Sequence, residues 1–222
     1  MLTDSELFRG LPESAAQRLV RGGRRRRFAR ASAIFDLGEA SAAMYVVLSG
    51  KVCVTRPAGH GRDNLLTLLA PGDLFGELTL FDPGPRRATA TALSDVVAIE
   101  FTSAAVRNWL EAETDGAWHF LGLLARRVRR TNDALDTLLY GDIPRRVARA
   151  LLDLAARFGQ LTSEGVRVNH DLTQEQLAHF VGASRESVNK SLSDLAGRGV
   201  VRLEQRGLVV LDEARLRRKA NG

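Results

Sequence analysis

The sequence predicts an α+β fold in which a β-barrel or jelly roll precedes a long helix and a C-terminal winged helix-turn-helix. Three observations predict it. Short apolar runs between residues 24 and 100 are separated by glycine and proline turns, residues 115–140 follow a helical heptad period, and residues 171–195 contain two short helices around a glycine. The expected boundaries are 1–113 for the N-terminal domain, 114–142 for the long helix and 143–222 for the winged domain.

Length and composition limit the possible classes of protein. With 222 residues, 45% of them hydrophobic, the chain can form one or two domains with real cores. The single cysteine, Cys53, excludes a disulfide framework, a four-cysteine zinc site and a four-cysteine iron–sulfur cluster. We find neither a signal-peptide core at the N-terminus nor an apolar run of about 18 residues. We therefore expect a cytoplasmic protein without a membrane partner or a bound metal.

The barrel strands are expected where β-branched and apolar residues cluster. The expected strands are 44–50, 51–55, 65–69 and 96–99, with turns at 49–50, 57–61, 71–73 and 82–85. Before them, the run Arg24–Arg27 could bind nucleic acid, but a solvated edge of the barrel is the favoured interpretation.

The long helix carries a regular apolar seam. Its members recur with alternating steps of three and four, as in a coiled coil: Leu121, Leu124, Val128, Thr131, Leu135 and Leu138. So narrow a stripe predicts a helix that pairs with its own copy in a homodimer. Thr131 is the polar member, and the seam alone leaves two equal interpretations for it: a residue that sets the register, or a ligand contact at the subunit boundary.

The C-terminal domain begins where Pro144 breaks the long helix, and an amphipathic helix follows over 145–158. Its 81 residues, 142–222, hold 14 of the 32 basic side chains and 10 of the 26 acidic ones. The net charge of +6 therefore leans towards this end of the chain, as expected for a domain that meets a polyanion.

The helix-turn-helix carries the strongest local signal. Thr173 and Ser184 are good N-caps, and Gly182 permits the left-handed turn between the two helices. Exposed polar side chains at the start of a second helix can read base edges in the major groove. The candidate DNA-binding residues are Thr173, Ser184, Arg185, Glu186, Ser187, Asn189 and Lys190.

Two features follow the second helix. Residues 199–204 and 207–211 alternate around Gln205-Arg206 and predict a β-hairpin wing. The basic C-terminal residues 215–219 are expected to form a frayed tail rather than a set of phosphate contacts.

A small-molecule site is indicated by the segment 72–89. It offers free backbone amides near Gly76, a carboxylate at Glu77 and guanidiniums at Arg86 and Arg87. A phosphate is bound by a guanidinium fork and backbone donors, and a ribose hydroxyl by a carboxylate. Spacing alone does not decide the matter, because arginines after a proline-glycine turn usually face solvent.

Three separated motifs make the assignment specific. Phe75-Gly-Glu-Leu-Thr-Leu-Phe81 with Arg86, the stretch Ala125-Arg-Arg-Val-Arg-Arg-Thr-Asn132, and Val181-Gly-Ala-Ser-Arg-Glu-Ser-Val188 occur in this order. Together they resemble the cAMP receptor protein/FNR family of bacterial transcription regulators, and most of all its actinobacterial cAMP receptor proteins. The resemblance covers nearly the whole chain.

The resemblance implies a cyclic-nucleotide site, with cAMP or another cyclic nucleotide as effector and no further cofactor. It assigns the phosphate to the Gly76 backbone and Arg86, and the ribose 2′-hydroxyl to Glu77. It implies that Thr131 and the partner subunit's Asn132 meet the adenine, which favours the ligand interpretation of Thr131. It places Arg127 near the pocket, which Leu66, Thr67 and Leu78 would line.

One departure from the family pattern concerns the residue after the phosphate arginine. The family commonly has Ser or Thr there, and this chain has Arg87. If the loop aligns one residue later, Arg87 holds the phosphate and Ala88 replaces the hydroxyl residue. In either alignment a hydroxyl donor is missing, so weak cAMP binding or another nucleotide is expected.

The resulting expectation is a homodimeric, cyclic-nucleotide-responsive regulator of double-stranded DNA. Its helix-turn-helix motifs would read a palindromic operator with half-sites about 34 Å apart, and RNA polymerase is an expected partner. The alternative is a constitutive DNA-binding regulator with a vestigial pocket. An enzyme is not expected, because the pocket offers no base–nucleophile pair. Haem sensing is not expected either, because the four histidines, at 60, 119, 170 and 179, show no ligand spacing.

Overall fold

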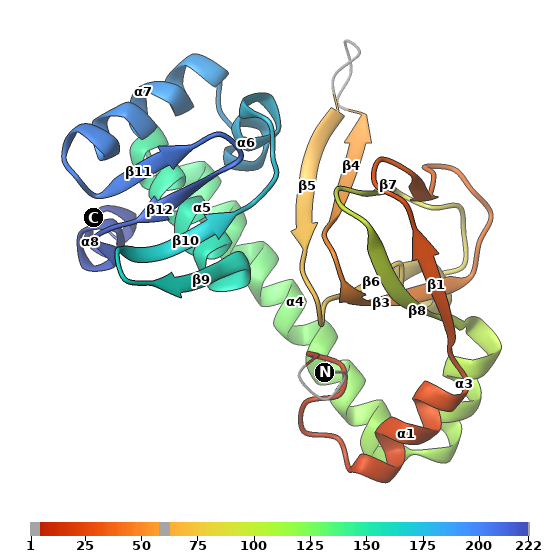
Figure 1. The fold of residues 1–222 in the computed structure, drawn as a ribbon. Helices are drawn as coiled ribbons and strands as arrows, with labels where there is room; N and C mark the ends of the chain where they lie inside the picture. The colour runs from red at the N-terminus through yellow and green to blue at the C-terminus, as the bar shows by residue number, and fades with distance from the viewer. Residues whose placement is uncertain (1–4, 58–62, 222) are drawn as a thin grey trace. The chain divides into compact units, whose positions relative to one another are not determined.

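The computed structural model describes residues 5–57 and 63–221, and Figure 1 labels most of their helices and strands. The chain divides into two compact units, 1–130 and 131–222, and the division falls inside helix α4 (Thr114–Tyr140). Within the described ranges, no helix is long and apolar enough to cross a membrane. Most of the turn expected at 57–61, including His60, lies outside these ranges.

The first unit contains two antiparallel four-stranded sheets, which confirms the expected β-barrel or jelly roll. One sheet has the order β1-β8-β3-β6, and the other has the order β2-β7-β4-β5. The strands are β1 (Arg24–Phe28), β2 (Ala33–Phe35), β3 (Ala43–Ser49), β4 (Val52–Pro57), β5 (Asp63–Leu69), β6 (Leu74–Phe75), β7 (Thr89–Ala92) and β8 (Val96–Thr102). The four expected strands correspond to β3, β4, β5 and β8.

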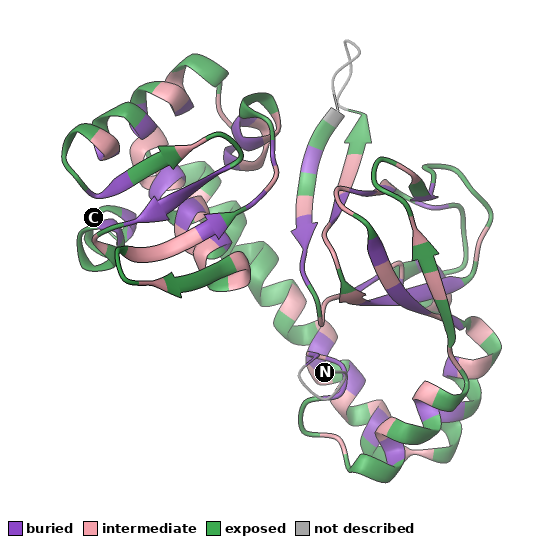
Figure 2. Ribbon diagram, in the orientation of Figure 1, coloured by how far each residue is buried: buried purple, intermediate pink, exposed green. Residues whose placement is uncertain are grey.

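Strand alternation gives the first unit two cores, one on each face of the sheet that contains β3. Successive side chains of a strand point to opposite faces. Met44 and Val46 therefore join a core with residues of the helices, whereas Tyr45 and Val47 join the core shared with the other sheet. Figure 2 shows β3 almost wholly buried and β1 mostly exposed, which agrees with the expected solvated edge at Arg24–Arg27.

Three helices of this unit had no counterpart in the sequence-based expectation: α1 (Glu13–Arg21), α2 (Leu78–Phe81) and α3 (Ser103–Ala112). Leu19 of α1 and Trp109 of α3 are buried in the same core, and the Trp109 indole donates to the Ala15 carbonyl at 2.9 Å. Thr102 caps α3 by accepting a hydrogen bond from the Ala105 amide.

Helix α4 agrees with the helix expected over 115–140. Its buried residues are Gly116, Phe120 and Leu123, all in the first turns. The seam is different, because Leu121, Val128 and Leu135 are 55%, 59% and 51% exposed. Large apolar side chains at heptad spacing are thus left uncovered by this single chain.

In the second unit the end of α4 is followed by α5 (Ile143–Phe158), whose N-cap Asp142 accepts a hydrogen bond from the Arg145 amide at 2.8 Å. This unit contains a four-stranded sheet of order β11-β12-β10-β9, in which the two strands of the expected wing pair with two further strands. The wing strands are β11 (Val201–Glu204) and β12 (Gly207–Val210); the strands that sequence reasoning missed are β9 (Gly159–Thr162) and β10 (Gly165–Asn169).

The expectation of a frayed C-terminal tail is wrong. Residues Glu213–Asn221 form helix α8, in which Leu216 and Ala220, four residues apart, are buried. Arg145 of α5 donates from Nε to the Ala220 carbonyl at 3.1 Å, and Arg217 pairs with Glu213. Burial of one face therefore orders a segment that its charge alone would leave in solvent.

Candidate functional site

The cassette, defined here as residues 72–89, is built around Gly76. This residue follows β6 with a φ of +77°, a conformation that glycine adopts without strain. A Cβ at this position would lie 3.0 Å from Nη1 of Arg86 and 3.1 Å from the Ala43 carbonyl oxygen. Glycine thus allows the Arg86 guanidinium to lie directly against the backbone that leads into α2.

Arg86 is the buried cation of the cassette, with only 2% of its surface exposed. Its Nη1 donates to the Gly76 carbonyl at 2.7 Å and to the Thr79 hydroxyl at 3.0 Å. Its Nη2 donates to the Ala43 carbonyl at 2.6 Å and to the Ser41 hydroxyl at 3.2 Å. The guanidinium also lies 4.1 Å from the centre of the Phe35 ring, so its position is fixed on all sides.

The charge of Arg86 is only partly compensated. Burial lowers the pKa of Arg86, and the nearby Tyr45, Glu39 and Glu77 oppose that shift. An arginine stays protonated under such a shift. Its buried Nε has no hydrogen-bond partner among the described residues. A buried cation with an unused donor favours binding of an anion.

Arg87 is placed differently from its neighbour. Its side chain is exposed, and its carbonyl accepts a hydrogen bond from Arg56 Nε at 2.9 Å. Of the two arginines considered for the phosphate, the structure therefore brings Arg86 together with Gly76.

Glu77 and Arg127 form the second polar element of the cassette. Glu77 is 2% exposed, and its Oε1 lies 3.0 Å from Nη1 of Arg127 on α4. The same Nη1 donates to the Leu74 carbonyl at 3.2 Å. A carboxylate has about four acceptor positions, so Glu77 can hold a hydroxyl group in addition to the arginine.

The other expected ligand residues are distributed over both units. Leu66 and Leu78 are exposed apolar side chains of the first unit, and Thr67 of β5 is half-buried. Thr131 and Asn132 belong to the second unit, where both are exposed. Their expected contact with the adenine stays a prediction.

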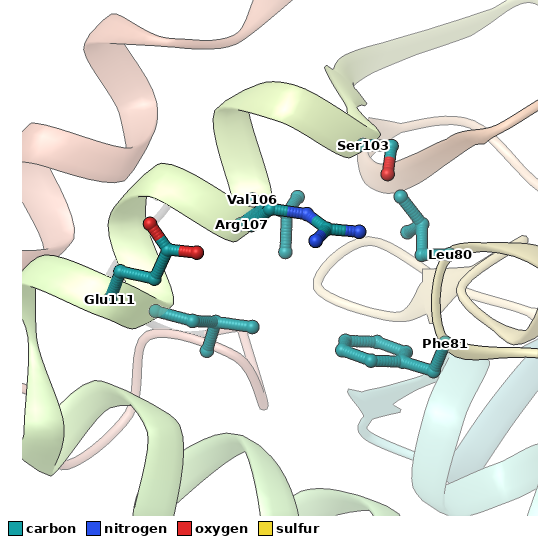
Figure 3. Close-up of a pocket in the computed structure, with 7 residues that line it drawn as sticks. Leu80, Phe81, Ser103, Val106, Arg107 and Glu111 are labelled. Atoms are coloured by element: carbon teal, nitrogen blue, oxygen red, sulfur yellow. The ribbon is translucent and has the colours of Figure 1, made fainter.

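Helix α2 of the cassette and helix α3 line a small hollow of about 250 Å³ (Figure 3). Four apolar side chains line it, from Leu80, Phe81, Val106 and Leu110. The three polar side chains of the lining are those of Ser103, Arg107 and Glu111. It contains none of the residues expected to bind the nucleotide.

The helix-turn-helix consists of α6 (Gln174–Val181) and α7 (Arg185–Gly197), as expected. Thr173 forms a capping box with Gln176, and the Ser184 hydroxyl accepts from the Ser187 amide at 3.2 Å. Gly182 has a φ of +70°, and a Cβ there would lie 2.9 Å from a methyl carbon of Leu138. Local capping and one left-handed glycine thus set the angle between the helices.

The exposed side of α7 carries the expected reading residues. Arg185, Glu186 and Lys190 are exposed, Ser187 and Asn189 are half-buried, and Val188, Leu192 and Leu195 face the core. Hydrogen bonds from its own amide and from the Ser184 hydroxyl lower the pKa of Glu186. Among the side chains that the structure describes, no carboxylate pairs with Arg185 or Lys190. Both cations are available to a polyanion.

The comparisons with known proteins decide the family. Residues 25–113 match the cyclic nucleotide-binding domain, and residues 145–219 match the Crp-like helix-turn-helix domain. A CRP-like cAMP-activated global transcriptional regulator of Mycobacterium tuberculosis is 44% identical over 220 residues, which cover 99% of this chain and 98% of that protein. The chain belongs to the CRP family.

Further CRP-family proteins agree in sequence and in fold. The cyclic AMP receptor protein of Thermus thermophilus is 35% identical, covering 96% of this chain and 94% of its own length. The crystal structure of a Thermus thermophilus catabolite activator protein is 34% identical, has a TM-score of 0.56 and covers 98% of this chain and 99% of its own. As a CRP-family member, this chain is a DNA-binding transcription regulator with a cyclic nucleotide-binding domain, and not an enzyme.

Sequence reasoning missed three residues around Arg86: Phe35, Ser41 and Thr79. Thr79 lies within the motif quoted for the resemblance, so its spacing could have drawn attention to it. Ser41 is 45 residues from Arg86 along the chain, and no local pattern connects them.

Proposed function

We propose that this CRP-family regulator is a homodimer whose binding to DNA is controlled by a cyclic nucleotide, with cAMP as the first candidate. Arg86 carries the proposal: it is a buried cation with an unused Nε donor, held against Gly76 and close to the carboxylate of Glu77. A cyclic phosphate supplies the missing acceptor and a ribose hydroxyl supplies a donor for Glu77.

The dimer is supported by the exposed seam of α4. Leu121, Val128, Leu135 and Leu138 are each about half exposed or more. Burial of such a stripe against a second copy removes apolar surface from water and is typical of a two-stranded coiled coil. In the proposed dimer, Thr131 of one subunit and the partner subunit's Asn132 meet the base of the nucleotide.

Two symmetric copies imply a symmetric operator. Each α7 would enter one major groove, with Arg185, Glu186 and Lys190 at base edges or phosphates, and half-sites would lie about 34 Å apart. RNA polymerase is the proposed protein partner, because a transcription regulator acts on promoter activity. Ligand would favour the arrangement of the two subunits in which both α7 helices reach DNA.

Calorimetric titration with cAMP and with cGMP tests the effector, and a gel shift on a palindromic operator tests the coupling. We expect heat with at least one nucleotide and tighter operator binding in its presence. If neither nucleotide gives heat and operator affinity does not change, the protein is a constitutive regulator and the proposed control is wrong.

The oligomeric state has its own test. Leu135→Lys places a charge in the exposed seam, and light scattering should report a monomer. The matched control is Asp133→Lys, an exposed position of the same helix outside the seam, which should remain dimeric. A monomeric wild-type protein would contradict the proposed dimer.

A further inference from the structure

Besides Nε of Arg86, two neighbouring hydroxyl groups are hydrogen-bond donors without an acceptor among the described residues. The hydroxyls of Thr79 and Ser41 both accept hydrogen bonds from the guanidinium, at 3.0 Å and 3.2 Å. Neither hydroxyl donates to another group in the part of the chain that the structure describes. A hydroxyl that accepts one bond still has a proton to donate. Within the described ranges, Nε of the buried cation and the two hydroxyls next to it are therefore three donors without acceptors.

Burial makes this arrangement informative. Thr79 is buried and Ser41 is half-buried, so water cannot freely satisfy the first of them. Most buried polar groups in folded proteins have partners, and a cluster of unfilled ones requires an explanation. All three groups are hydrogen-bond donors that lack an acceptor in the described part of the chain, and an oxyanion is a compact group with several acceptor oxygens.

We infer that Thr79 and Ser41 donate to the two non-bridging phosphate oxygens of the bound nucleotide, so that these hydroxyls replace the one absent at Arg87 and Ala88. This inference rests on the proposed function. It revises the expectation of a missing hydroxyl donor, because the donors come from α2 and from the segment before β3 instead of the residue after the arginine.

The geometry assigns the two hydroxyls to different oxygens. Thr79 lies at Nη1 of Arg86 and Ser41 lies at Nη2. Nη1 and Nη2 already donate to four acceptors, so the phosphate in this inference is bound by the free Nε and by the hydroxyls that lie at the two different Nη atoms. Each hydroxyl is then next to a different non-bridging oxygen.

The test uses cAMP and its two phosphorothioate diastereomers, each with sulfur in place of one non-bridging oxygen. Removing a hydrogen bond to a charged group weakens binding by roughly tenfold or more, so Thr79→Val and Ser41→Ala should each lose about that factor for cAMP. Sulfur accepts hydrogen bonds weakly. The two variants should therefore shift the preference between the diastereomers in opposite directions, which a purely structural role would not do.

Control variants distinguish a loss of folding from a loss of the contact with the phosphate. Thr79→Ser keeps the hydroxyl and should bind as the wild type does, and Thr91→Val removes a hydroxyl from β7 that has no bond to Arg86. If Thr79→Val fails to fold, Ser41→Ala still tests the inference, because Ser41 is only half-buried. Unchanged cAMP affinity in both variants, or shifts of the diastereomer preference in the same direction, would overturn it.

Failure of the proposed function has a different signature. A wild-type protein that binds no cyclic nucleotide contradicts that proposal, and inorganic phosphate then becomes the probe in a thermal shift assay. Stabilisation of the wild type but not of Ser41→Ala supports the oxyanion site with another ligand. Absence of any stabilisation of the wild type overturns both.

Discussion

Arg86 and Arg185 belong to the two regions that meet the proposed partners, and their surroundings are opposite. Arg86 is 2% exposed and has four acceptors around it before any ligand binds, whereas Arg185 is exposed at the first position of α7 without an ion pair among the described residues. Burial of a charge is costly unless partners are built in. The cassette is therefore preorganised for one small anion, while α7 relies on DNA for its partners.

The largest expected effect comes from removing the cation of the cassette. Arg86→Met leaves the buried Ala43 carbonyl and the Gly76 carbonyl without their donor, so we expect the free energy of unfolding to fall by about 3 kcal/mol. Nucleotide binding should be lost. Urea unfolding and calorimetry measure both. Arg87→Met, at the exposed neighbour, should leave stability unchanged. Equal destabilisation by the two variants would contradict the conclusion that burial distinguishes Arg86 from an exposed arginine.

A charge reversal on α7 is expected to change DNA binding and to leave the stability of the fold unchanged. Arg185→Glu with Glu186→Arg removes base contacts worth about 1–3 kcal/mol each, so specific operator footprints should disappear. Stability should not change, since both side chains are exposed. Lys190→Ala should weaken binding uniformly across sequences and reduce the salt slope by about one. Unchanged footprints after the reversal would contradict the assignment of α7.

A smaller effect is expected at Glu77. If its carboxylate accepts the ribose 2′-hydroxyl, the wild type should bind cAMP about tenfold more tightly than 2′-deoxy-cAMP, the range for a hydrogen bond to a charged group. Glu77→Gln should reduce that ratio towards one, as measured by calorimetry. A ratio that survives the substitution would assign the 2′-hydroxyl to another residue.

The smallest expected effect is at the surface of the winged domain. Arg202 lies 2.6 Å from Glu164 and lowers the pKa of that carboxyl from its usual 4.5. A lowered pKa in the folded state gives a stabilisation that is present above about pH 4.5 and is lost as pH falls through the folded value. Glu164→Gln should therefore lower the melting temperature slightly at pH 7 and by less at pH 3, because this stabilisation weakens as the pH falls. An equal effect at both pH values would exclude the ion pair as its cause.

The helix-turn-helix was predictable because its signals are local. Thr173, Gly182 and Ser184 each act on residues within a few positions, and the structure uses them as caps and as the left-handed turn. Helix α8 was not predictable in this way, because burial of Leu216 and Ala220 in the folded domain decides its order. Helices α1 and α3 likewise depend on contacts such as that of Trp109 with the Ala15 carbonyl.

The cassette likewise contains residues that local sequence signals predict and residues that only the folded structure brings together. Gly76, Glu77 and Arg86 lie within one motif and could be named from it. The choice between Arg86 and Arg87 depends on which of two adjacent side chains turns inward, and no pattern of residue types fixes that direction. Ser41 and Phe35 reach Arg86 only because β2 and β3 fold against the cassette.

Strand β1 has a consequence for the behaviour of the protein in concentrated solution. It is one of the two edge strands of its sheet, and it carries Arg24, Arg25, Arg26 and Arg27 in sequence. An uncovered edge is a template on which strands of other molecules can add, and charged side chains prevent such growth. Of these four, Arg26 is paired with Glu100. The run therefore places like charge along the sheet edge and protects the barrel against aggregation through strand addition.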